Sequence, residues 1–198
     1  MDPTVNAFNT LFMASRRPWT TRWRGVELIK SPLDLWIYAE LLWRVRPRSV
    51  VETGTHAGGS ALWLADMLDV FGIDGHVTTI DVLDDHRRPS HPRITYVSGS
   101  STVVPLPDLP APVMVILDSD HSAEHVHAEL LRFADLVTPG SYLIVEDTNV
   151  PEHAPDLPGD AGEAVRWFLA ERDDYVADVE CERYLQTCNP GGYLRRIR

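Results

Sequence analysis

Residues 49–72 read SVVETGTHAGGSALWLADMLDVFG, and this stretch decides the fold. It begins with a short β-branched run over 49–52, passes through a glycine-bearing turn, and ends with apolar residues at helical spacing over 59–72. A buried strand that turns tightly into a helix is the repeating unit of a parallel α/β sheet. The stretch therefore predicts a strand, a glycine loop and a covering helix, in that order.

The same alternation of strand and helix repeats along the chain. Apolar runs typical of buried strands occupy residues 76–81, 94–97, 113–118 and 141–146, and residues 121–137 predict an amphipathic helix. Before them, residues 31–47 predict a helix that begins after the N-cap Ser31 and stops at Pro47. This order implies a mostly parallel sheet with helices on both faces, a doubly wound, Rossmann-like α/β fold.

The C-terminal part of the chain predicts a loop, a helix and a pair of strands. Residues 150–160 are rich in Pro, Gly and Asp and predict a long loop, of the kind that often carries function. A helix is predicted over 162–171, followed by strands at ERYLQ (182–186) and GYLRR (192–196). We expect these two strands to form an antiparallel pair that closes the sheet.

Composition favours one domain and excludes several partners. The chain has 198 residues, of which 44% are hydrophobic, which suits one domain with a full core. No run approaches the roughly 18 apolar residues of a membrane span, so we expect a cytoplasmic protein without a membrane partner. The net charge of −11 argues against DNA or RNA as a partner, because such binding needs a basic face. Two cysteines are too few for a disulfide scaffold.

Residues 1–30 are expected to form an N-terminal arm, a substrate lid or oligomer contact, ahead of one domain over 31–198. The arm carries a basic cluster interleaved with tryptophans: Arg16, Arg17, Trp19, Arg22, Trp23, Arg24 and Lys30. Charge runs usually lie in solvent, so we expect the cluster at the surface or at an interface. Tryptophans in the arm and first helix favour a homo-oligomer.

The glycine loop predicts a ligand site, because open α/β sheets bind ligands outside the carboxyl ends of their strands. Gly54 and Gly58 let the backbone approach a ligand, and the following helix offers free N–H groups. The loop lacks GxGxxG, so a ligand with a carboxylate and an ammonium fits better than a pyrophosphate. Glu52 would lie near its cationic end, and Asp81 can accept the hydroxyls of a ribose. The alternative is that the glycines only permit a tight turn and that Asp81 caps the next segment of the chain.

Acidic residues also end two later strands. Asp118 and Asp120 follow one predicted strand, and Glu146 and Asp147 end the next. Converging carboxylates repel one another unless a cation neutralises them, and hard oxygen ligands suit Mg²⁺, or less selectively Mn²⁺ or Ca²⁺. His121 comes directly after Asp120, at the start of the predicted helix and within reach of whatever a metal there would orient. Histidine is the side chain that most often serves as a general base, so we predict this role for His121. The alternative is that the first two acids cap the helix while the other two lie in solvent.

Residues 121–125 also match the HxxEH pattern of some zinc peptidases. Here the pattern opens the helix of an α/β unit, directly after a strand that ends in an acid, which disfavours a peptidase. We expect His125 and His127 to be ordinary helix-surface residues.

Six motifs together carry a resemblance to a known family. VETGTHAGGSALWLAD, TTIDV, VSGSS, ILDSDHSAEHVHAEL, VTPGSYLIVEDTNV and ERYLQTCNPGGYLRR resemble the cephalosporin hydroxylase and rhamnosyl O-methyltransferase family over roughly residues 19–198. The acid-and-histidine arrangement is similar to that of metal-dependent sugar O-methyltransferases from macrolide biosynthesis. These families use S-adenosylmethionine (SAM) and typically Mg²⁺, and they modify hydroxyls of sugars or secondary metabolites.

The resemblance implies a class I SAM-dependent methyltransferase fold and a role for each matching residue. The SAM site would be lined by Glu52, Gly54, Thr55, Gly58 and Ser60, with Asp81 on the ribose and Ser98, Gly99 and Ser100 beside the adenine. The ligands of Mg²⁺ or Mn²⁺ would be Asp118, Glu146 and Asp147, with His121 as the base. The macrolide enzymes often have DGSH where this chain has DSDH, so Asp120 is an extra acid.

These observations predict a SAM- and Mg²⁺-dependent O-methyltransferase acting on a small-molecule hydroxyl acceptor, in antibiotic or other natural-product biosynthesis. One alternative is a noncatalytic partner subunit that binds SAM or a metabolite within a tailoring complex. Another is an NAD-dependent oxidoreductase, which the missing GxGxxG disfavours.

Overall fold

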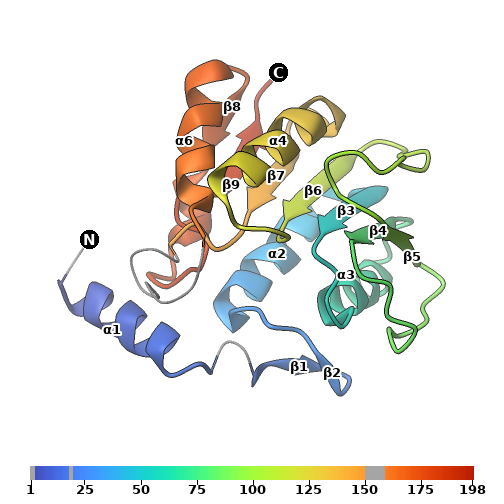
Figure 1. Cartoon of the computed structure of the whole chain (residues 1–198), viewed down its shortest axis with the longest axis horizontal. Helices are drawn as coiled ribbons and strands as arrows, with labels where there is room; N and C mark the ends of the chain where they lie inside the picture. The colour runs from blue at the N-terminus through green and yellow to red at the C-terminus, as the bar shows by residue number, and fades with distance from the viewer. Residues whose placement is uncertain (1–2, 18–19, 150–158) are drawn as a thin grey trace.

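A seven-stranded sheet forms the centre of the protein, and helices lie on both of its faces (Figure 1). The computed structural model describes residues 3–17, 20–149 and 159–198. In chain order the strands of the sheet are β3 (Ser49–Thr53), β4 (His76–Asp81), β5 (Ile94–Ser98), β6 (Val113–Leu117), β7 (Tyr142–Val145), β8 (Tyr175–Ala177) and β9 (Tyr193–Arg196). Their spatial order is β5-β4-β3-β6-β7-β9-β8. Strands β3 to β7 pair in parallel, and β9 is antiparallel to both β7 and β8, which confirms the predicted fold class.

The order of the strands reverses at the centre of the sheet. From β3 the chain moves outward through β4 and β5, and it then returns to place β6 on the other side of β3. The ends of β3 and β6 are pressed together there, because a Cβ atom added at Gly54 would lie 1.7 Å from the backbone oxygen of Asp118. Open α/β sheets bind their ligands at such a switch point.

Two pairs of helices cover the sheet. Helices α2 (Pro32–Val45) and α3 (Gly59–Val70) pack on one face, and α4 (Ala123–Phe133) and α6 (Ala161–Glu171) pack on the other (Figure 1). Successive strand residues point to opposite faces, so Val50 belongs to the first core and Val51 to the second. Two short 3-10 turns, η2 (Ala134–Leu136) and η3 (Val179–Glu182), lie after α4 and before β9. Among the helices of the described residues, none is long and apolar enough to cross a membrane.

The N-terminal segment folds back onto helix α3. After α1 (Pro3–Ala14), the short strands β1 (Arg22–Trp23) and β2 (Val26–Glu27) form an antiparallel hairpin. Trp23 Nε1 donates to Asp66 of α3 at 2.7 Å, and Arg24 pairs with the same carboxylate at 2.9 Å. We call residues 20–30 the strap. The predicted division of the chain at residue 30 stays a prediction, and Trp19 lies outside the described residues.

The prediction of a strand over 182–186 is wrong. Glu182 ends η3 and residues 183–186 continue as a turn, and the edge strand is β8 instead. Tyr175 is 3% exposed, packs on Phe168 with ring centroids 5.1 Å apart, and donates to the Ala134 carbonyl at 2.7 Å. Leu185 is 66% exposed with φ +67, so the apolar residues of 182–186 do not face a core. The long loop predicted over 150–160 lies outside the described residues except for its last two positions.

Candidate active site

A cavity of about 650 Å³ opens at the carboxyl ends of the central strands. Many residues singled out from the sequence line it, and they come from five different segments: Gly54, Thr55 and Ser60 around the start of α3, Asp81 at the end of β4, Gly99 after β5, Asp118 and His121 after β6, and Asp147 after β7. Neighbouring parallel strands bring these positions to one edge of the sheet. The structure thus gathers these eight of the predicted site residues around a single cavity.

Glu52 lies in the core and is not among the lining residues of this cavity. Its side chain is fully buried and accepts a hydrogen bond from Thr79 Oγ1 at 2.7 Å. Its Oε1 atom lacks a hydrogen-bond partner within the part of the chain that the structure describes. Burial raises the pKa of this carboxyl. A buried oxygen without a partner is costly, so Glu52 is available to a cationic group that approaches the end of β3.

Three other predicted cofactor residues lie next to the cavity rather than in its wall. Gly58 is the N-cap of α3 at φ +81, Ser98 ends β5, and the Ser100 hydroxyl is 2.9 Å from that of Thr102. The neighbouring Gly59, Gly99 and Ser101 line the cavity instead. The predicted loops border the cavity, and a contact of each of these three residues with SAM stays a prediction.

The Asp81 carboxylate is held at the end of β4 by three groups. Its Oδ2 accepts from the backbone N–H of His56 at 2.8 Å, and its Oδ1 accepts from that of Leu83 at 2.9 Å. Arg88 approaches Oδ2 to 3.2 Å. These contacts fix a carboxylate at the cavity wall, where hydroxyl groups of a ligand can donate to it.

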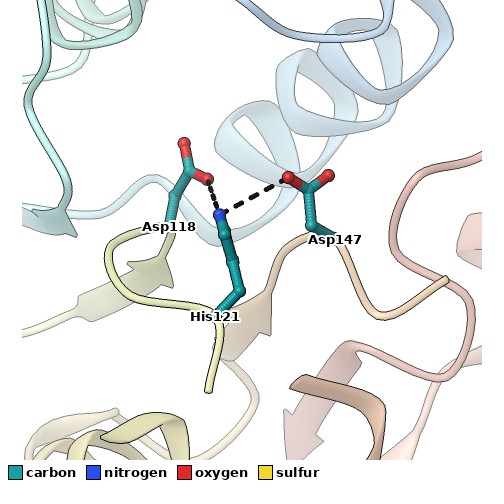
Figure 2. Close-up of side chains that lie close together, drawn as sticks. All are labelled: Asp118, His121 and Asp147. Carbon is teal, nitrogen blue, oxygen red and sulfur yellow. Dashed lines mark ion pairs between the residues drawn. The ribbon is translucent and has the colours of Figure 1, made fainter. Parts of the chain in front are cut away.

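The side chains of Asp118, His121 and Asp147 point toward one another, as Figure 2 shows. All three residues line the same cavity. His121 Nε2 lies 3.5 Å from Asp147 Oδ2 and 3.9 Å from Asp118 Oδ1. One potential ligand atom from each of the three residues lies within 4.8 Å of the others. Two carboxylates and an imidazole at this separation fit a divalent cation.

Glu146, predicted as a third acidic metal ligand, faces a different partner. Its Oε1 atom accepts from Lys30 Nζ at 2.6 Å and from Tyr38 Oη at 2.7 Å. Lys30 Nζ also donates to Asp118 Oδ2 at 2.7 Å, and the lysine side chain is only 2% exposed. The expectation that Lys30 belongs to a surface or interface cluster is therefore wrong. The buried cation that pairs with the acids at the strand ends is the ammonium group of Lys30, from the end of the strap.

The extra acid Asp120 lines the cavity but lies outside the group of three. Its Oδ1 accepts from the backbone N–H of Ser122 at 2.8 Å. Hydrogen bonding to the Ser122 side chain, and next to its backbone, lowers the pKa of Asp120. This contact closes a turn in front of α4, whose N-cap is Ser122, so Asp120 does not cap the helix as the alternative interpretation of the sequence expected.

Burial dominates the electrostatics of the acidic cluster. It raises the pKa of Asp118 and of Asp147, and it raises the pKa of Glu146 to about 7, with the Asp118 charge adding to the effect. Lys30 opposes the shift in all three groups. Because a raised carboxyl pKa means that protons are held more tightly, protons and metal ions compete for this site.

Sequence reasoning missed two parts of the cavity wall. Strap residues Glu27, Leu28 and Ile29 line it, and so does His125, which was expected on the helix surface. The expectation for His125 is wrong, because its Nε2 lies 3.3 Å from Ser119 Oγ and meets other polar side chains of the wall. No local pattern indicates either contact, since both depend on how separate elements pack.

The fold and the cavity define the class of protein first. A solved CmcI structure whose description names Mg and SAM superposes with a TM-score of 0.74 at 27% identity, covering 91% of this chain and 78% of that one. An O-methyltransferase from Bacillus cereus in complex with SAH shares the fold at 17% identity and a TM-score of 0.54, covering 88% of this chain and 82% of its own. The chain has the fold of a SAM-dependent methyltransferase.

The family is identified by the sequence comparisons. The model of the family described as Rhamnosyl O-methyltransferase/CmcI matches residues 17–197. A rhamnosyl O-methyltransferase from Mycobacterium tuberculosis is 36% identical over an alignment of 196 residues that covers 90% of this chain and 79% of that protein. One from Mycobacterium leprae is 35% identical over 178 residues, covering 83% and 77%. The chain belongs to the Rhamnosyl O-methyltransferase/CmcI family, and with this fold it is a SAM-dependent O-methyltransferase.

Proposed function

We propose that this protein transfers the methyl group of SAM to a hydroxyl oxygen of a sugar or another natural product, with Mg²⁺ or Mn²⁺ in the site. One observation carries the proposal: Asp118, His121 and Asp147 converge at the wall of the same cavity as the glycine loop (Figure 2). A hydroxyl bound at this cluster would therefore lie next to a methyl donor bound along the loop. The family relatives named as rhamnosyl O-methyltransferases support a sugar hydroxyl.

The methyl donor fits the part of the cavity between β3 and β5. Gly54 and Thr55 would let the donor approach the backbone at the start of α3, and Ser60 would face it from the helix. Asp81 would accept the ribose hydroxyls, because its carboxylate is already fixed at the cavity wall. Glu52, with its unpaired buried oxygen, would attract the cationic amino-acid end.

The metal would be held by Asp118 and Asp147, with Glu146 joining only if it leaves Lys30. A bound divalent cation supplies positive charge that lowers the pKa of a neighbouring hydroxyl. His121 would accept the hydroxyl proton on Nε2, and the Asp147 carboxylate, 3.5 Å from this atom, would stabilise the imidazolium that forms. The oxygen then bonds to the methyl carbon as the sulfur–methyl bond of SAM breaks, which leaves SAH, the methylated hydroxyl oxygen and a proton on His121.

His121 has two possible roles, because its Nε2 is also placed among the potential ligand atoms. The replacement His121→Gln separates them. As a base, the residue is needed for the rate alone, so kcat would fall about 10²- to 10⁴-fold while Mn²⁺ affinity stays unchanged. If the residue is a metal ligand, both kcat and the affinity for Mn²⁺ would fall.

The experiment combines a rhamnosyl-type acceptor with SAM, and it measures methyl transfer by mass spectrometry and Mn²⁺ binding by calorimetry. His127→Gln is the matched control, since that histidine lies on α4 against Glu171 and Trp167, away from the acid cluster. Transfer at the full rate in EDTA would refute the metal requirement. Transfer at the full rate by His121→Gln would remove this residue from the mechanism.

The alternatives make different predictions in the same calorimeter. A noncatalytic partner subunit would bind SAM and methylate no hydroxyl acceptor, whereas an oxidoreductase would prefer NAD to SAM. The homo-oligomer also stays a prediction. Trp36 and Trp43 are each 60% exposed and are side chains that self-association could cover, so light scattering should report more than one chain per particle.

A further inference from the structure

Lys30 places a positive charge inside the acidic cluster before any metal is considered. Its ammonium group donates to Glu146 Oε1 at 2.6 Å and to Asp118 Oδ2 at 2.7 Å. The charges of Glu52 and Asp34 act on the same group from further away. A lysine side chain is almost never fully buried unless it is paired, and this one is paired with the acids that the family resemblance assigns to the metal.

The strap fixes the backbone from which this ammonium projects. The Lys30 backbone N–H donates to Thr21 Oγ1 at 3.2 Å, and the Thr21 hydroxyl donates to the Lys30 carbonyl at 3.2 Å. Further along, a Cβ atom added at Gly59 would lie 2.0 Å from the Glu27 carbonyl oxygen, so the strap packs closely on the start of α3. Lys30 is therefore held in place by its own segment as well as by its ion pairs.

The lysine divides the oxygen atoms of the cluster into two groups. Asp118 gives Oδ2 to Lys30, whereas its Oδ1 lies on the side of His121. Glu146 gives its Oε1 to Lys30 and Tyr38 together. A metal ion that used the Asp118 and Glu146 oxygens now bonded to Lys30 would have to displace the ammonium group. A metal ion that left the ammonium group in place would bind next to it and would be repelled by its positive charge.

We propose that Lys30 is a built-in counter-ion that competes with a divalent cation for Asp118 and Glu146 and so weakens the affinity of the site for metal. It is a positioning residue, and this role rests on the proposed function, in which the cluster holds a metal. In the metal-free protein Lys30 neutralises buried carboxylates that would otherwise repel one another. On metal binding it gives up part of that contact.

The test is Mn²⁺ calorimetry on EDTA-treated protein, with Lys30→Met compared with the wild type. Methionine is unbranched like lysine and keeps most of the length of the side chain, and it removes the charge. The variant should bind Mn²⁺ at least 10-fold more tightly. It should also unfold at a lower temperature in EDTA and gain more thermal stability from Mn²⁺ than the wild type gains. A side chain that only fills space would leave the Mn²⁺ affinity unchanged.

Arg24→Met is the matched control. It removes one positive charge from the same strap, but this residue pairs with Asp66 on the surface of α3 instead of the cluster. Its Mn²⁺ affinity should equal that of the wild type. If Lys30→Met fails to fold in EDTA, Lys30→Gln, which keeps a hydrogen-bond donor without the charge, should change the affinity in the same direction.

An equal or weaker Mn²⁺ affinity in the folded, uncharged variants would overturn the proposal, and so would the absence of Mn²⁺ binding in every protein tested. SAM binding is measured in separate titrations. A wild type that binds Mn²⁺ but not SAM would refute the proposed function and leave the comparison at Lys30 intact.

Discussion

Replacing Gly54 with alanine tests the close approach of β3 and β6 on which the site depends. Gly54 has φ +82, and the added Cβ atom would lie 1.7 Å from the Asp118 backbone oxygen. Real Cβ atoms essentially never come within 3.0 Å of such a neighbour, so the two strand ends must separate by about 1.3 Å. Asp118 would move away from His121 and Asp147 as a result.

The cost has two parts that the chain itself can separate. An alanine in the left-handed region costs roughly 1–2 kcal/mol, and forcing an extra carbon into a packed site costs typically about 1–3 kcal/mol. Gly140 has φ +87 with nothing within 4 Å of its Cβ position, so Gly140→Ala carries only the first cost. We expect the free energy of unfolding to fall by about 1–2 kcal/mol in Gly140→Ala and by about 2–5 kcal/mol in Gly54→Ala.

The assays are urea unfolding and SAM calorimetry on both variants. Gly54→Ala should also weaken SAM binding at least tenfold, because the donor is proposed to lie against this backbone, whereas Gly140→Ala should bind SAM as the wild type does. A displacement of about 1 Å at Asp118 should lower the rate of methyl transfer by about 10²-fold. If Gly54→Ala were no less stable than Gly140→Ala and bound SAM normally, the close approach at the switch point would have no role in the site.

The remaining predictions concern the contact of Asp81 with SAM and the pH dependence of the acidic cluster. Asp81→Asn should weaken SAM binding about 10- to 100-fold in calorimetry, because hydrogen bonds to a charged acceptor contribute about 1.5–3 kcal/mol. The control is Asp174→Asn, which changes a carboxylate that pairs with Arg172 instead. Equal SAM affinities for the two variants would argue against a ribose contact of Asp81. Mn²⁺ affinity should rise from pH 5.5 to pH 7.5, because burial raises the pKa of Glu146 to about 7 and protons leave the cluster over this range. The raised pKa of Glu146 also affects stability. In the metal-free folded state Glu146 keeps its proton up to about pH 7, whereas in the unfolded chain it loses the proton at the ordinary, lower glutamate pKa. The free energy of unfolding measured in EDTA should therefore fall as the pH rises towards 7. If neither the Mn²⁺ affinity nor the free energy of unfolding in EDTA varied with pH, the raised pKa of Glu146 would be contradicted.

Local patterns predicted most of the elements correctly. Strand β4 has the predicted bounds, and α2 begins after Ser31, whose hydroxyl accepts from the Leu33 backbone N–H. These features depend on residues close together in the sequence, such as apolar runs, caps and breakers. The edge strand β8 was missed because its place depends on Tyr175 meeting Phe168 and the Ala134 carbonyl, a contact with other elements rather than a local pattern.

The sequence by itself determined the fold class and the edge of the sheet where the site lies, because acids that end parallel strands must come to one edge. Asp81, Asp118 and Asp147 were identified in this way, and all three line the cavity. Only the tertiary structure decided which charges meet. Lys30 reaches Asp118 and Glu146 across 88 and 116 positions of the chain. No local sequence pattern predicts such a long-range ion pair. It forms because the strap packs on α3 and because a charge that is shielded from solvent is costly unless it is paired.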